Sequence, residues 1–202
     1  GLDGVSLQRL GQLLLAWGAA WWALALASEV MRFVTVDMQT SVLLVVAALS
    51  ALIWMLLALR TRWSELATLC SLLAPVAGLI LIHAWHSFYH PAAHFGWVGW
   101  AAVIRVHLLI LRSLVDLLPR KAVSVAHVLG CWLLLGVLAL ELRYLLLSLS
   151  DHYNAWRWLG WALLPTAYLW AMAQARRLPW PVASFEREYR LWAAAPLAAL
   201  ML

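Results

Sequence analysis

The 202-residue sequence has few charged side chains and almost no cysteine. Charged residues make up 11% of the chain, whereas about 25% is usual for a soluble domain, so a water-soluble globular protein is excluded. Intrinsic disorder is excluded as well, because 66% of the residues are hydrophobic and 15 are tryptophan. Cys70 and Cys131 lie in apolar runs without C-x-x-C spacing, so they predict neither a metal site nor a redox pair.

Catalytic and nucleotide-binding motifs are also missing. The chain has no G-x-x-x-x-G-K-[ST], G-x-S-x-G or H-E-x-x-H, so no hydrolase or ATPase is supported and no cofactor is expected. The net charge of +5 comes from cations scattered between apolar runs, so it does not predict nucleic-acid binding. No basic segment precedes a short apolar one at the N-terminus, so no cleavable signal peptide is predicted.

What the sequence has instead is long apolar runs. Runs of about 19 or more apolar residues predict membrane-spanning helices, and these lack the short alternation of barrel strands. The sequence therefore predicts an all-α fold, a polytopic transmembrane bundle with six full spans and the start of a seventh near Leu191. The six spans cover residues 10–30, 41–59, 66–84, 96–118, 122–142 and 156–174. Pro75 and Pro165 predict a kink or an unwound turn in the third and sixth spans.

The distribution of Lys and Arg predicts the orientation. Ten of the 14 basic residues lie at the N-terminus or in the even-numbered connections, and three lie on the other side. Basic residues concentrate on the cytoplasmic side of membrane proteins. We therefore expect a multi-pass protein of the bacterial inner membrane with its N-terminus in the cytoplasm.

The sequence also shows an internal repeat. Gly18 and Glu29 in the first span match Gly130 and Glu141 in the fifth, with a separation of 11 residues in both. Two further pairs of segments match in the same order: Trp54–Trp63 with Trp170–Trp180, and Ala74–Leu81 with Ala195–Leu202. Landmarks repeated in order predict a duplicated unit. Because each unit has four spans, the repeats would be parallel, with one unit at 1–121 and a second at 122–202 that stops in its third helix.

Several short motifs resemble one protein family. They are His94–Trp100, His127–Leu134, Ala139–Leu142, Trp180-Pro181, Tyr189 and Ala195–Leu197. The chain resembles a large bacterial family of very long inner-membrane proteins, catalogued as a domain of unknown function, with many helices behind a cytoplasmic N-terminal segment. The resemblance implies the helical fold and the membrane location, and it brings no established catalytic residues. Because the chain opens at Gly1 and stops at Leu202 inside an apolar run, we expect it to be one section of such a protein.

The third connection and its flanks carry four histidines. His83, His86, His90 and His94 are spaced by three, four and four residues, which would place them on one face if the segment were helical. Neutral histidine is a common metal ligand and proton carrier, so a metal, proton or substrate site is one interpretation. Pro91 interrupts the segment and no carboxylate lies within it, so an interfacial connection without a metal is favoured.

Arg105 is the charged residue that lies deepest in a predicted span. An arginine there costs about 2.5–3.5 kcal/mol on insertion scales and normally pairs with a carboxylate or an anionic ligand. Arg112 and Asp116 can form their own ion pair at i,i+4 spacing, so the expected partners of Arg105 are Glu29 and Glu141. The favoured interpretation for Glu29 and Glu141 themselves is a local interfacial ion pair that ends each helix, since each has an arginine two or three residues further on.

Three functions remain open from the sequence. The first is binding or translocation of an anionic or amphiphilic envelope component, with Arg105, Glu29, Glu141 and the four histidines as binding residues. The second is a membrane-embedded enzyme that acts on a lipid-linked substrate at the periplasmic face, with His83, His86, His90 or Glu29 as general base. The third is a structural scaffold. We favour the first, with membrane lipids and other transmembrane segments of a longer chain or homo-oligomer as partners.

Overall fold

The fold was analysed in a computed structural model, which describes residues 2–85, 90–149 and 155–200. All regular elements in these ranges are helical. The α-helices are α1 (Leu2–Phe33), α2 (Val36–Thr61), α3 (Ser64–Cys70), α4 (Leu73–Ala84), α5 (Gly96–Ser113), α6 (Arg120–Leu149), α7 (Ala155–Ala173) and α8 (Ala194–Leu200). A 3₁₀ turn, η1 (Ala175–Arg177), and a π-helical segment, η2 (Glu188–Ala193), lie between α7 and α8.

Among the residues that the structure describes, four helical segments are long and apolar enough to cross a membrane. They are Arg9–Phe33 in α1, Val36–Thr61 in α2, Ser64–Ala84 across α3 and α4, and Arg120–Leu149 in α6. The predicted all-α membrane fold is confirmed by these segments. α5 and α7 lie where the fourth and sixth spans were predicted, but their described residues are not among the segments that meet this criterion of length and composition.

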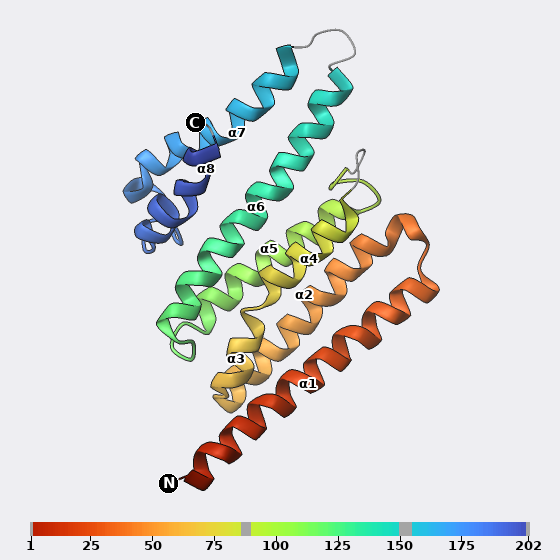
Figure 1. The fold of residues 1–202 in the computed structure, drawn as a ribbon, viewed down its shortest axis with the longest axis vertical. Coiled ribbons are helices and arrows are strands. Elements are labelled where there is room, and N and C mark those ends of the chain that lie inside the picture. Colours follow the sequence, from red (N-terminus) through yellow and green to blue (C-terminus); the bar gives the residue numbers. More distant parts are fainter. Residues whose placement is uncertain (1, 86–89, 150–154, 201–202) are drawn as a thin grey trace.

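The helices form an array in which α1 lies at one edge (Figure 1). α1 packs against α2, where Trp22 Nε1 donates a hydrogen bond of 3.1 Å to Ser50 Oγ. α2 packs most closely against α5, and α4 contacts both α5 and α6. α6 therefore separates α2–α5 from the smaller group formed by α7, η2 and α8.

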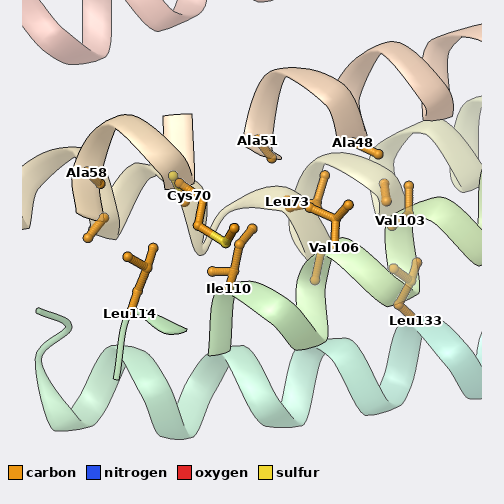
Figure 2. Packing of buried hydrophobic residues seen from close by; sticks show 14 of the residues in the cluster. Ala48, Ala51, Ala58, Cys70, Leu73, Val103, Val106, Ile110, Leu114 and Leu133 are labelled. Carbon is orange, nitrogen blue, oxygen red and sulfur yellow. The ribbon is translucent and has the colours of Figure 1, made fainter. Parts of the chain in front are cut away.

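Small side chains on α2 allow this close packing. Ala48, Ala51 and Ala58 are buried and lie against residues of the next layer, such as Cys70 and Leu73 (Figure 2). In a membrane, close approach of helices depends on such small residues, because lipid gives little hydrophobic driving force between them.

Proline interrupts the third predicted span as expected. α3 ends at Cys70 and α4 begins at Leu73, with a turn at residues 71 and 72. Pro75 has no N–H to bond the carbonyl of Ser71, so the helix is broken one turn before it. At Pro165 no unwound turn is formed, because α7 runs through this residue without a break, and a kink there stays a prediction.

The fourth span is shorter than predicted. α5 ends at Ser113 rather than at residue 118, and the Leu114 N–H still bonds the Ile110 carbonyl at 2.9 Å. The amides of Leu117 and Leu118 then both bond the Leu114 carbonyl, which closes a tight turn. Pro119 disfavours helical geometry in the residue before it, so α6 can begin only after the turn, at Arg120.

Candidate functional site

The first polar feature joins the connection between α4 and α5 to α6. His90 Nε2 lies 3.4 Å from Glu141 Oε1, and the backbone N–H of Ala92 donates to Glu141 Oε2 at 3.2 Å. The His90 ring also contacts Tyr144 edge-to-face, with ring centroids 4.1 Å apart. Glu141 thus holds the connection through both of its oxygens.

The other side of this connection is attached to α2. Ser41 Oγ donates a 2.7 Å hydrogen bond to the backbone carbonyl of His94. His94 and Phe95 have positive φ values of 48° and 63°, which turn the chain sharply into α5. The turn brings Gly96 so close to the Pro91 carbonyl that a Cβ at Gly96 would overlap it. The connection is therefore clamped between α2 and α6.

The predicted histidines are only partly brought together. α4 ends at Ala84, so the condition of a helical segment is not met and the described members His83, His90 and His94 do not share one helix face. His83 is exposed on α4, His94 is exposed in the turn, and His86 lies outside the described residues. Within residues 2–85, 90–149 and 155–200, no group of three or more His, Cys, Asp or Glu side chains could hold a metal ion.

Arg105 lies on the open face of α5 and forms no ion pair with a described residue. Glu29 is exposed on α1 and is also unpaired in the described part of the chain, whereas Glu141 is paired with His90. The binding role of these three residues stays a prediction.

The ion pair predicted between Arg112 and Asp116 is not formed. α5 ends at Ser113, so the i,i+4 geometry that would join the two side chains is lost. The Arg112 guanidinium lies instead over the Trp180 ring, 5.7 Å from its centroid.

The second polar feature is buried where α5 meets α6. His107 is 4% exposed, and its Nε2–H donates a 3.1 Å hydrogen bond to the Ala126 carbonyl on α6. The imidazole can lie this close to α6 because residue 130 is glycine: a Cβ at Gly130 would overlap the ring. The His107–Gly130 contact therefore fixes the distance between the two helices.

A further set of hydrogen bonds joins α6 to α7 and η2. His127 is 1% exposed, and its Nδ1 lies 3.0 Å from the Tyr189 hydroxyl. Cys131 Sγ donates to the Tyr168 hydroxyl at 3.4 Å, and that hydroxyl donates to the Tyr189 carbonyl at 2.8 Å. Phe185 stacks on the His127 ring, with centroids 3.9 Å apart. The chain of donors ends at a carbonyl, which cannot pass a proton on, so these contacts position η2 on α6.

The segment Glu186–Arg190 carries alternating charges, as a solvated linker would, but part of it packs against α6. Tyr189 is buried, and Ser124 Oγ donates a 2.7 Å hydrogen bond to Glu188 Oε1. Both residues belong to the π-helical segment η2, which packs against α6.

Only the outward side of this segment is charged and exposed. Hydrogen bonds from Arg176 and then from Arg190, each 3.0 Å long, hold the pKa of Glu186 below its ordinary value. Because this pKa is lowered on folding, these ion pairs are retained at neutral pH and lost as the pH falls through the lowered value.

Tyr189→Phe tests the contact between α6 and η2. The substitution leaves both ring nitrogens of the buried His127 without a partner among the described residues, since Nε2 already has none. We expect a loss of about 1–3 kcal/mol of stability, measured as a lower thermal unfolding midpoint in mild detergent. The matched control is Tyr144→Phe, because the Tyr144 ring contacts His90 while its hydroxyl makes no described hydrogen bond. Equal midpoints for the two variants would contradict a structural role for the Tyr189 hydroxyl.

The sequence and the structure together define a polytopic α-helical membrane protein. A family model described as "Predicted membrane protein (DUF2339)" matches residues 12–202, so the chain belongs to this family. No curated protein and no solved structure matches the chain.

Proposed function

We propose that this chain is a section of an integral membrane protein that binds an anionic, amphiphilic component of the cell envelope along the open face of α5. The observation that carries this proposal is Arg105, which is exposed and has no ion-pair partner among the described residues. A charged group in this setting needs a counter-charge from outside the described chain.

Arg105 lies near the middle of α5, and this position makes a counter-charge for its guanidinium especially important. α5 has 18 residues, which corresponds to a length of about 27 Å, close to the hydrocarbon thickness of a bilayer. Arg105 lies near its middle, far from both helix ends. An anionic headgroup drawn to this depth, or one held by a local thinning of the bilayer, would offset the cost of the unpaired guanidinium.

The surroundings of Arg105 favour a ligand that is both anionic and apolar. Trp97 and Leu109 are exposed on the same side of α5, and Arg112 lies two turns beyond Arg105. A planar guanidinium binds phosphate and carboxylate oxygens in pairs, while the exposed apolar side chains accept hydrocarbon. A phospholipid or a lipid-linked phosphate combines these two properties.

The membrane topology that we propose for the chain is the one predicted from its sequence. We place the N-terminus in the cytoplasm of a bacterial inner-membrane protein, count α5 and α7 as spans, and divide the chain into parallel four-helix units at residues 121 and 122. One structural similarity supports the repeat: each unit has a helix irregularity about one turn before its matched proline. The break at Ser71 and Leu72 precedes Pro75, and the π-helical η2 precedes Pro196.

The test is native mass spectrometry of the protein in mild detergent with phosphatidylglycerol as the probe. We expect Arg105→Leu to weaken the tightest lipid adduct about tenfold or more, because a charge-assisted hydrogen bond contributes about 1.5–3 kcal/mol. Arg143→Leu is the control, since Arg143 is also exposed but lies outside α5. Equal lipid retention by the wild type and both variants would contradict the proposal.

The His90–Glu141 pair favours a second candidate, an enzyme acting on a lipid-linked substrate. The imidazole and the carboxylate lie 3.4 Å apart, as a general base and its orienting group do. Glu141 also accepts the Ala92 amide, which gives the pair a structural use. We therefore rank the enzyme below the binding protein, and a scaffold without ligand is the outcome if no lipid is retained.

A further inference from the structure

One face of α1 is uncovered along most of its length. The face consists of Leu14, Gly18, Trp21, Ala25 and Glu29, which we call the α1 stripe. These residues are spaced by three or four positions, so they lie in line on one side of a helix. All five are exposed, with Leu14 at 62% and Trp21 at 57%, and α1 lies at the edge of the array (Figure 1).

The matching face of α6 is covered. At the repeat offset of 112 residues, the α1 stripe corresponds to Ala126, Gly130, Leu133, Val137 and Glu141. Ala126, Leu133 and Val137 are at most 8% exposed, and Leu133 is directed toward α5 in Figure 2. α4, α5 and their connection cover this face of α6.

Two residues of the α1 stripe, Gly18 and Glu29, lack the contacts that their equivalents on α6 make. Gly130 lies against His107 of α5, whereas a Cβ at Gly18 would meet nothing within 4 Å. Glu141 binds His90 and the Ala92 amide, whereas Glu29 is unpaired in the described part of the chain. The α1 stripe and its equivalent on α6 are therefore similar surfaces. α4, α5 and their connection cover the one on α6, whereas the α1 stripe is uncovered.

The neighbouring face of each helix contacts the next helix in the chain, at positions that differ by three residues at the offset of 112. One residue beyond Trp21, Trp22 bonds Ser50 of α2, the next helix in the chain. One residue beyond Gly130, Cys131 bonds Tyr168 of α7, again the next helix in the chain. α1 thus directs one face toward α2, and α6 directs one face toward α7. The α1 stripe and its equivalent on α6 lie on the neighbouring face of each helix.

We propose that the α1 stripe binds a helical hairpin of the α4–α5 type, supplied by a preceding four-helix unit of the same polypeptide. The hairpin would direct a polar side chain toward Gly18, and the connection between its two helices would donate hydrogen bonds to Glu29. This inference rests on the four-helix repeat proposed above but not on lipid binding at Arg105. A second copy of this chain is the wrong occupant, because the face of its α5 that carries His107 is already covered by its own α6.

The test is photo-cross-linking of the full protein in its own membrane. A small diazirine amino acid is placed at Ala25 in the stripe or at Val137, its buried equivalent on α6. Leu13 and Val125 serve as a matched pair of controls, because both are exposed and are equivalent in the repeat. Cross-linked peptides are identified by mass spectrometry, and the size of the polypeptide is measured on a denaturing gel.

We expect the probe at Val137 to label α4 or α5, and the probes at Leu13 and Val125 to label lipid. The probe at Ala25 should label a histidine-bearing apolar helix of the same polypeptide, outside α1–α8, without a change in polypeptide size. Gly18→Leu should reduce this product at least fivefold and leave the Val137 product unchanged. Lipid adducts at Ala25, or a product of twice the polypeptide size, would overturn the proposal. Lipid binding at Arg105 is read separately, so either proposal can fail alone.

Discussion

Gly130→Ala is expected to destabilise the protein by about 2–4 kcal/mol. The added methyl group would overlap the buried His107 ring, which cannot move without losing its hydrogen bond to the Ala126 carbonyl. Overpacking of a tight interface costs about 1–3 kcal/mol, and an unsatisfied buried polar group adds about 1–3 kcal/mol. The measurement is the thermal unfolding midpoint of the 202-residue chain in mild detergent.

Gly18→Ala is the matched control at the equivalent position of the repeat. A Cβ there meets nothing within 4 Å, so we expect no loss and a gain of up to about 1 kcal/mol from helix propensity. The double variant Gly130→Ala/His107→Ala should recover part of the stability, since the clash is removed with the ring. If Gly130→Ala were as stable as Gly18→Ala, the close contact between α5 and α6 would be wrong.

Gly96→Ala is expected to release the connection between α4 and α5. A Cβ at Gly96 would overlap the Pro91 carbonyl, which is a backbone atom and can move only if the whole turn opens. Opening the turn would break the bonds that join the connection to Glu141 and Ser41. We expect a loss of about 2–4 kcal/mol together with strong exposure of residues 90–95, measured by modification of a cysteine at Ala93.

Gly78→Ala controls for a general effect of the substitution, because Gly78 is a helical glycine with open space around its Cβ position. As for Gly18→Ala, the unfolding midpoint should not fall, and the reactivity at position 93 should be unchanged. Equal reactivity in Gly96→Ala and Gly78→Ala would show that the turn is not held as described.

The fold class was predictable because membrane insertion depends on local sequence. Long apolar runs define the helices, and Pro75 alone predicts the break between α3 and α4. The end of α5 was missed because Leu114, Val115, Leu117 and Leu118 extend the apolar run after the helix has ended. An apolar composition indicates which residues can lie in lipid, but it does not show where a helix ends. The turn after Ser113 depends on backbone hydrogen bonds and on Pro119.

The polar contacts were only partly predictable, because they join residues far apart in the chain. Glu141 and His90 were both recognised as candidates, but their separation of 51 positions gave no reason to pair them. Tyr189 was missed for a related reason. The charges around it indicate solvent, whereas in the π-helical segment η2 it lies against His127, 62 positions earlier. The signal that was present is the pair of histidines in apolar runs, His107 and His127, since a polar side chain in such a run needs a buried partner.

The polar contacts of α6 have a mechanical consequence. The carbonyl of Ala126 binds His107 on one side, and the next residue, His127, binds Tyr189 on the other. A small rotation of α6 about its axis would shift both contacts at once, because they lie at the same height on opposite flanks. The two groups of helices, α2–α5 on one side and α7, η2 and α8 on the other, should therefore unfold cooperatively. When force is applied to either end of the chain, we expect both groups to separate from α6 in a single step.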